Sequence, residues 1–147
     1  MNLVDALLGE HGVFYALFAH LEGRLKKGGS PAEIQEAAAV LVATLISHAK
    51  IEEELLFPAL EQHLGPAGPL SVMRGEHEQI DGVLDEVAGG RQSGDGATAL
   101  LHALQVARDH FAKEEQVLFQ MARQALDTNL LVELGSQWAE RRGVALG

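Results

Sequence analysis

The sequence predicts an all-α protein, an up-down-up-down four-helix bundle with a short fifth helix toward the C-terminus. Apolar residues recur at intervals of three and four, and the alternation of two that marks β-strands is absent. Breaks rich in glycine and proline divide the 147 residues into segments of helix length. Because these breaks are short, consecutive helices are expected to be antiparallel neighbours in a bundle.

Most of the breaks have the composition of a helix end, a helix start or both. Residues 28–31, Gly-Gly-Ser-Pro, supply two glycines that end a helix, a serine cap and a proline suited to the first helical position. Further breaks lie at 65–69 and 89–96, and a turn lies at 127–129. The helices are therefore expected over about 2–27, 31–64, 70–88, 97–125 and 129–142.

Two residues qualify this outline. Pro58 lies inside the second helix and should kink or end it, because proline lacks the backbone N–H that an interior position needs. Trp138 should dock the fifth helix on the bundle. At this length one domain over residues 1–147 is expected, with the bundle itself spanning about 2–125.

Composition excludes several classes of protein. Without cysteine there are no disulfides, zinc–thiolate sites, iron–sulfur clusters or thiol nucleophiles. The formal net charge of −10 argues against binding nucleic acid or anionic membranes, which requires a basic face. No apolar run reaches the length of a membrane span, and the first residues lack the pattern of a secretory signal. A soluble, cytoplasmic protein is therefore expected.

Histidine and glutamate recur in the same order in two parts of the chain. Residues 48–57, His-Ala-Lys-Ile-Glu-Glu-Glu-Leu-Leu-Phe, correspond to 110–119, His-Phe-Ala-Lys-Glu-Glu-Gln-Val-Leu-Phe. Gly-Glu-His at 9–11 likewise returns at 75–77. The repetition predicts two copies of one helical hairpin, each bringing two imidazoles and a carboxylate to a shared metal centre.

Helical spacing places six polar residues on the otherwise apolar faces of the four long helices. Burying them without partners would cost several kcal/mol per ion, a cost that a bound cation removes. Two facing clusters with two carboxylates able to bridge suit two metal ions, and nitrogen and oxygen ligands suit iron, with manganese or zinc as alternatives. The candidate metal ligands are His11, His48, Glu52, His77, His110 and Glu114.

The same spacing assigns other residues to the buried faces or to the surroundings of the centre. After the two candidate glutamates it places Leu55, Ala59, Val117 and Met121 on the buried face. Five phenylalanines should fill the core and keep the centre dry: Phe14, Phe18, Phe57, Phe111 and Phe119. Three histidines are expected outside the centre: His20, His63 and His102.

Some residues near the candidate ligands keep alternative roles. Asp81 follows His77 by one helical turn and is either a further ligand or a bystander. Tyr15 follows His11 in the same way and is either a core residue with a satisfied hydroxyl or a gate or proton donor. Four more glutamates are expected to be solvated or to hydrogen-bond ligand imidazoles rather than to bind metal. They are Glu10, Glu53, Glu76 and Glu115.

These motifs together resemble the hemerythrin family, in the form called HHE cation-binding domains, over about residues 5–125. The matching segments are His11, His48-x3-Glu52-Glu53 with Leu56-Phe57-Pro58, Glu76-His77 and His110-x3-Glu114. The resemblance implies a single hemerythrin-like domain with a non-heme di-iron centre and an oxo or hydroxo bridge. The implied terminal ligands are His11, His48, His77 and His110, and the implied bridging ligands are Glu52 and Glu114.

The chain also departs from the oxygen-carrying hemerythrins. They have a second histidine one turn after the first on helix 3, where this chain has Asp81. They also place the helix 4 carboxylate one residue further from its histidine. A nearly symmetric centre with four imidazoles should leave each iron with open positions. This argues against reversible oxygen carriage and favours iron sensing or the handling of nitric oxide or peroxide.

The first functional hypothesis is a di-iron protein that binds dioxygen, peroxide or nitric oxide at an open iron position. Peroxidase- or catalase-like turnover stays open, although the sequence shows no separate acid–base pair or substrate pocket that would favour it. The second is an iron-sensing or iron-storage module in which the binding of iron makes the helical bundle ordered. The third is a metal-free bundle for protein interaction. The sequence identifies no protein partner and contains no motif for an organic cofactor.

Overall fold

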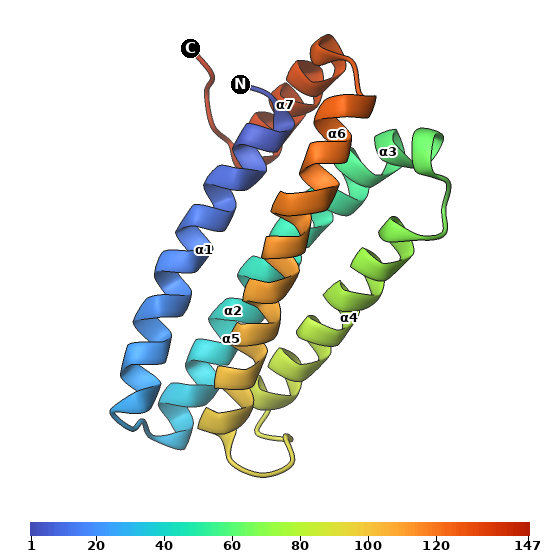
Figure 1. The fold of residues 1–147 in the computed structure, drawn as a ribbon. Helices are drawn as coiled ribbons and strands as arrows, with labels where there is room; N and C mark the ends of the chain where they lie inside the picture. Colours follow the sequence, from blue (N-terminus) through green and yellow to red (C-terminus); the bar gives the residue numbers. More distant parts are fainter.

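Four long antiparallel rods form the body of the protein, and a shorter helix crosses one end of them (Figure 1). The computed structural model describes residues 1–147 and contains no strand, so the predicted all-α bundle with a fifth helix is confirmed. In chain order the elements are α1 (Leu3–Lys26), α2 (Pro31–Ile51), η1 (Glu52–Leu56), α3 (Phe57–Leu64), α4 (Pro69–Ala88), α5 (Gly96–Lys113), η2 (Glu114–Leu118), α6 (Phe119–Ala125) and α7 (Thr128–Arg142).

Side-chain caps begin four of the helices, and three of these helices follow a predicted break. At the start of α2, the hydroxyl oxygen of Ser30 accepts a hydrogen bond from the backbone N–H of Glu33 at 3.2 Å, and Pro31 follows as the first helical residue. The preceding loop turns at Gly28, whose φ of 89° favours glycine. The four capping residues are Asn2, Ser30, Asp95 and Asp127.

Two of the rods contain a π-helical turn at equivalent places of the sequence repeat. The turn η1 joins α2 to α3, and η2 joins α5 to α6; each begins at the glutamate of a His-x3-Glu motif. The rod continues through Pro58 as far as Leu64. The second copy has Gln120 at the position equivalent to Pro58 and forms the same turn, so proline is not required for it.

These turns shift the buried face by one residue, and here the expectation from simple helical spacing was wrong. Beyond Glu114, Val117 is 51% exposed and Met121 is only partly buried, while Leu118 and Ala122 are buried instead. In the first copy Leu55 is buried as expected, but Leu60 takes the place of Ala59, which is only partly buried. A π turn adds one residue to a helical turn, which advances every later side chain by one position.

The apolar core forms two blocks, one on each side of the middle of the bundle. The block near α7 includes Leu7, Leu56 and Phe119, and the block near the α1–α2 loop includes Phe18 and Leu41. All five phenylalanines are buried, as expected. Between the blocks lie the only buried polar residues of the chain: His11, His48, Glu52, His77, His110 and Glu114.

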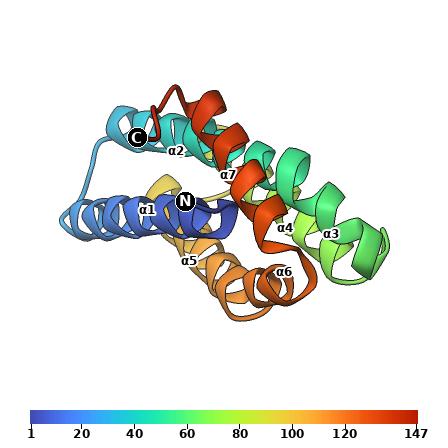
Figure 2. The same ribbon diagram turned by 90° about the horizontal axis from the view of Figure 1, so that it is seen from above.

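The helix α7 lies across the end of the bundle at which both termini are found (Figure 2). Leu131 and Leu134 are buried in the adjacent core block, and Trp138 packs against it, so the expected docking by Trp138 is confirmed. Gly135 allows a close crossing, because a Cβ atom there would lie 2.4 Å from the carbonyl oxygen of Met1.

One continuous helical stretch, Pro31–Leu64, is long and apolar enough to cross a membrane by length and composition alone. The sequence-based expectation was that no apolar run reaches the length of a membrane span, whereas this stretch meets the criterion by its average hydropathy. The core helix of a soluble protein passes the same test, and 39% of the most apolar window of this stretch is buried inside the protein. The stretch also carries His48 and Glu52 in the interior of the bundle.

Candidate metal centre

The six candidate ligands meet in the middle of the bundle. One histidine comes from each of α1, α2, α4 and α5, and the two glutamates are the first residues of η1 and η2. Each of the six side chains is at most 6% exposed. The structure therefore brings together all of the residues that the sequence repeat indicated.

The six side chains form two clusters that share both glutamates. The donor atoms of His11, His48, Glu52 and Glu114 lie within 4.8 Å of one another, and we call this group cluster A. The donor atoms of His77, His110, Glu52 and Glu114 also lie within 4.8 Å of one another, and we call this second group cluster B.

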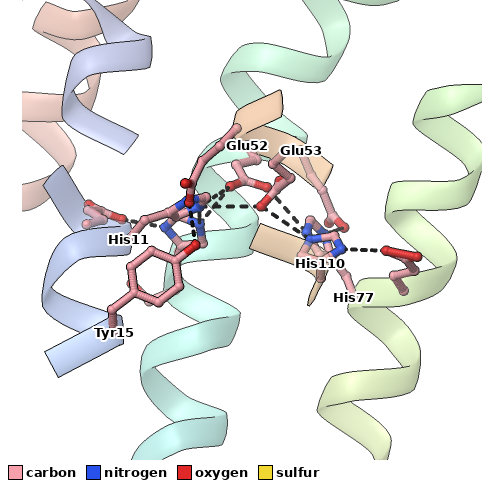
Figure 3. A network of polar contacts seen from close by, with 12 residues as sticks. His11, Tyr15, Glu52, Glu53, His77 and His110 are labelled. Carbon is pink, nitrogen blue, oxygen red and sulfur yellow. Dashed lines mark hydrogen bonds and ion pairs between the residues drawn. The ribbon is translucent and has the colours of Figure 1, made fainter. Parts of the chain in front are cut away.

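Each shared glutamate faces both clusters. Oε1 of Glu52 lies 2.6 Å from Nε2 of His48, and Oε2 of the same carboxylate lies 3.3 Å from Nε2 of His77 (Figure 3). Oε1 of Glu114 lies 3.4 Å from Nε2 of His11 and 3.3 Å from Nε2 of His110. Each carboxylate thus lies between the imidazoles of cluster A and those of cluster B.

Several of these buried atoms make no well-aligned hydrogen bond. They are both carboxylate oxygens of Glu52, both of Glu114, and Nε2 of His110. Leaving such groups uncompensated in an apolar interior is costly, and a cation at each cluster would compensate them. A donor set of imidazole and carboxylate without sulfur suits iron, manganese or zinc. The chemistry of the site therefore fits a metal centre.

A glutamate from a neighbouring rod holds each imidazole on its outer side. Because Nδ1 is engaged there, Nε2 is left to face the interior, as is usual for metal-binding histidines. Each rod supplies one histidine and one such glutamate, so the contacts form a closed ring around the bundle. The Nδ1–Oε distances are 2.8 Å for His48–Glu10, His77–Glu53 and His11–Glu115, and 2.9 Å for His110–Glu76.

A model of the hemerythrin HHE cation-binding domain matches residues 2–126. The chain belongs to the hemerythrin family. Membership and the buried donor set together identify the centre as a metal site, as the sequence motifs indicated.

Two curated proteins are similar to this hemerythrin domain. A DNA nickase of Nostoc sp. is 27% identical over 140 residues, which cover 95% of this chain and 37% of that protein. The iron–sulfur cluster repair protein YtfE of Cronobacter sakazakii is 36% identical over 63 residues, or 42% of this chain and 28% of that protein. The matches cover only about a third of the length of these relatives. No solved structure matches the chain.

The outer glutamates of this hemerythrin domain differ in the further residues that donate hydrogen bonds to their carboxylates, which we call their braces. Glu10 accepts hydrogen bonds from Trp138 and Arg142 of α7, each at 2.7 Å. Burial opposes ionisation of Glu10, but its bonds with His48, Arg142 and Trp138 outweigh this and lower its pKa to about 2. Glu53 makes no side-chain hydrogen bond or ion pair other than that with His77 and is 37% exposed.

The other two outer glutamates have one brace each. Glu115 accepts a hydrogen bond from the hydroxyl of Tyr15 at 2.5 Å, and Glu76 accepts one from the exposed Lys113 at 2.6 Å. Tyr15 is therefore a partly buried residue with a satisfied hydroxyl, and its ring also lies edge-on to His11 with centroids 6.3 Å apart. The sequence left open whether each outer glutamate is solvated or holds an imidazole; in the structure all four contact an imidazole, and none belongs to either cluster.

Asp81 belongs to neither cluster. It lines a small cavity of about 10 Å³ beside His48, His77 and His110, walled by apolar residues that include Ile80 and Phe111. Burial raises the pKa of Asp81 above its usual value. The three remaining histidines lie outside the centre and are exposed, as expected: His20, His63 and His102.

Aromatic rings pack directly against the inward-facing imidazoles. Phe111 stacks on His11 with ring centroids 3.9 Å apart and an interplanar angle of 8°, and Phe57 lies parallel to His77 at 5.9 Å. These contacts hold the ring planes and separate the centre from water, which strengthens electrostatic interactions within it.

In the metal-free protein, protons partly neutralise the centre. Burial raises the pKa of Glu114 well above its usual value, and the charge of Glu52 raises it further. Burial also opposes ionisation of Glu52, but the His48 cation outweighs this and holds the pKa of Glu52 well below its usual value. Burial alone would lower the pKa of His48, but Glu52 and Glu10 raise it to about 9. Metal binding must therefore release protons.

Proposed function

We propose that this hemerythrin-family protein holds two iron ions and binds a small oxidant at them. His11 and His48 would be terminal ligands of the ion in cluster A, and His77 and His110 those of the ion in cluster B. Glu52 and Glu114 would bridge the two. The observation that carries the proposal is that two four-residue clusters share both buried carboxylates, whose oxygens lack other partners.

The choice of iron rests on the ligand chemistry and on similarity. Imidazole and carboxylate donors without thiolate suit iron, although manganese and zinc remain alternatives. The relative from Cronobacter sakazakii is named as an iron–sulfur cluster repair protein, which supports iron over the other two metals. When bound, iron would supply Lewis acidity and redox capacity.

The size of the neighbouring cavity supports a small ligand. Its volume of about 10 Å³ is close to the space that one water molecule needs, so dioxygen, nitric oxide or peroxide is the class of ligand expected. Five of the nine residues that line the cavity are apolar, and Asp81 is one of the four polar ones. With its raised pKa, the carboxyl group of Asp81 is suited to hold or give up a proton beside a bound ligand.

Metal analysis of the purified protein, with anomalous scattering at the iron edge, tests the first part of this proposal. Two iron ions per chain, one at each cluster, are expected. Zinc at both positions, or a single ion bound by all six residues, would contradict it.

The second part of the proposal, oxidant binding, is tested by absorption spectroscopy. Nitric oxide or hydrogen peroxide should change the absorption spectrum of the iron-loaded protein, and an unchanged spectrum would exclude oxidant binding. Rapid, repeated consumption of peroxide would indicate peroxidase- or catalase-like turnover.

A second candidate function is an iron-sensing or iron-storage module without turnover. The buried unpartnered atoms of Glu52, Glu114 and His110 favour it, because a metal-free centre of this kind should weaken the bundle. Loss of helical circular dichroism on iron removal would support this candidate. Retained helicity together with a spectral response to nitric oxide would favour oxidant binding.

The activity in the name of the Nostoc relative is not proposed for this chain. The matched segment covers 37% of that protein, and the formal net charge of −10 argues against DNA binding by this domain. We expect a cytoplasmic protein that acts on a small molecule without contacting nucleic acid or a membrane. A third candidate, a metal-free interaction bundle, would require the purified protein to carry no metal.

A further inference from the structure

The last helix reaches the metal centre although it lies outside the segment that the family model matches. The match ends at residue 126, and α7 begins at Thr128. From α7, Trp138 and Arg142 contact Glu10, and Glu10 contacts Nδ1 of His48. Two hydrogen bonds in series thus join α7 to an imidazole of cluster A.

The contact made by Arg142 is bidentate. Its Nε donates to Oε2 of Glu10 at 2.7 Å, and its Nη2 donates to Oε1 of the same carboxylate at 2.9 Å. Such paired bonds from a planar guanidinium fix the direction of a carboxylate as well as its position. The carboxylate of Glu10 is only 16% exposed, so solvent screens this interaction weakly.

Arg142 also holds the chain beside His48. Its Nη1 donates to the hydroxyl oxygen of Ser47 at 2.7 Å, and its Nη2 lies 3.3 Å from the carbonyl oxygen of the same residue. One side chain of α7 therefore contacts both the carboxylate that orients the His48 ring and the backbone that carries it. α7 makes no hydrogen bond to any other outer glutamate, so the hydrogen-bonded path from α7 leads to an imidazole of cluster A.

We propose that α7 positions His48, so that docking of α7 and metal binding at cluster A favour each other. The inference rests on the proposed ligand role of His48. Because coupling between two binding events is reciprocal, a docked α7 that raises the metal affinity by some factor is itself stabilised by the metal by the same factor. Arg142 and Trp138 are positioning residues in this scheme and touch no metal.

The first test compares metal affinity in matched variants. Metal-free wild-type protein, Arg142→Leu and Arg141→Leu are titrated anaerobically with iron(II). Arg141 is the neighbouring arginine of α7 and pairs with the exposed Glu54. Removing an outer partner of a ligand histidine costs roughly 10- to 100-fold in metal affinity. Arg142 acts on His48 through Glu10, so Arg142→Leu should lose affinity for one of two iron equivalents by the lower end of that range, about tenfold. Arg141→Leu should bind both equivalents like the wild type.

Two further measurements distinguish a positioning role of Arg142 from a general loss of structure: the affinity of a conservative variant, and the effect of iron on the docking of α7. Arg142→Lys keeps a donor for Glu10 and should recover part of the lost affinity. In hydrogen exchange, iron should slow the α7 amides of the wild type. In Arg142→Leu, iron should still slow exchange in α4 but no longer in α7. Fluorescence of Trp138, the single tryptophan, gives an independent record of docking.

The result that overturns the inference is equal affinity of Arg142→Leu and the wild type for both iron equivalents. Exchange in α7 that is the same with and without iron would overturn it as well. If Arg142→Leu does not fold, Gly135→Leu provides a second route, because a side chain there collides with the backbone of Met1 and Asn2 and should displace α7. Unchanged affinity in a folded Gly135→Leu protein with α7 displaced would count against the coupling. Failure of the wild type to bind any metal would instead refute the proposed function.

Discussion

Clusters A and B have the same donors but different surroundings. In cluster A, the outer carboxylates Glu10 and Glu115 are braced by Arg142, Trp138 and Tyr15. In cluster B, Glu76 is braced by a lysine whose side chain is 55% exposed. The remaining outer carboxylate of cluster B, Glu53, has no brace. The donors occupy equivalent positions in the two copies of the sequence repeat, whereas none of the bracing residues recurs at the equivalent position of the other copy.

This difference implies unequal metal binding at the two positions. An imidazole whose ring is fixed before the metal arrives loses less conformational freedom on binding than one held by a mobile carboxylate. Cluster A should therefore fill first and empty last. The predictions below test this comparison between the clusters.

The largest effect is expected at a shared ligand. Glu52→Gln removes the charge from a carboxylate that faces both clusters, so both ions should be lost together. Metal analysis should find far less than one ion per chain. Glu54→Gln, an exposed change two residues away, is the control and should load normally. Retention of one tightly bound ion would show that the two clusters do not depend on a common bridge.

A change within one cluster should remove one ion. His110→Ala takes a donor from cluster B alone and should roughly halve the metal content, leaving the ion of cluster A visible by anomalous scattering. His102→Ala, an exposed histidine on the same helix, should load like the wild type. Equal loading in the two variants would refute the ligand assignment.

The pH dependence of metal binding should reflect the raised pKa of His48, about 9. Below that pH the metal must displace a proton from the imidazole, so the affinity of cluster A should rise as the pH increases. It should level off above about 9. For one proton the expected slope is about tenfold per pH unit. A manganese(II) titration that is monitored by electron paramagnetic resonance and repeated between about pH 6.5 and 8.5 measures this slope. A flat profile would mean that His48 is neutral in the metal-free protein.

The smallest effects are expected at the outer glutamates, where the clusters should differ most clearly. Glu10→Gln should lower the affinity of cluster A by roughly 10- to 100-fold, the usual range for an outer partner. Glu53→Gln should lower that of cluster B less, because Glu53 is unbraced and partly exposed. Calorimetric titration of both variants tests the order. A greater loss in Glu53→Gln would reverse the comparison.

Some of the structure was predictable because helical spacing is a local property. The helix boundaries followed from caps such as Ser30 and breakers such as Gly28. The six interior polar residues followed from the repeat and from their position among apolar neighbours. The exposed His102 was separated from the buried His110 by the same argument. The one-residue shift beyond Glu52 and Glu114 was missed, although the apolar pairs Leu56-Phe57 and Leu118-Phe119 that follow each glutamate are compatible with it.

The amino-acid sequence alone was sufficient to predict the all-α bundle and the set of residues at its centre, since a helix places each side chain by its distance along the chain. Only the tertiary structure decided which carboxylate meets which imidazole, and that Arg142 reaches Glu10. Those contacts join residues up to 132 positions apart. They depend on the rotation and height of every rod relative to the others, which the packing of the whole core determines.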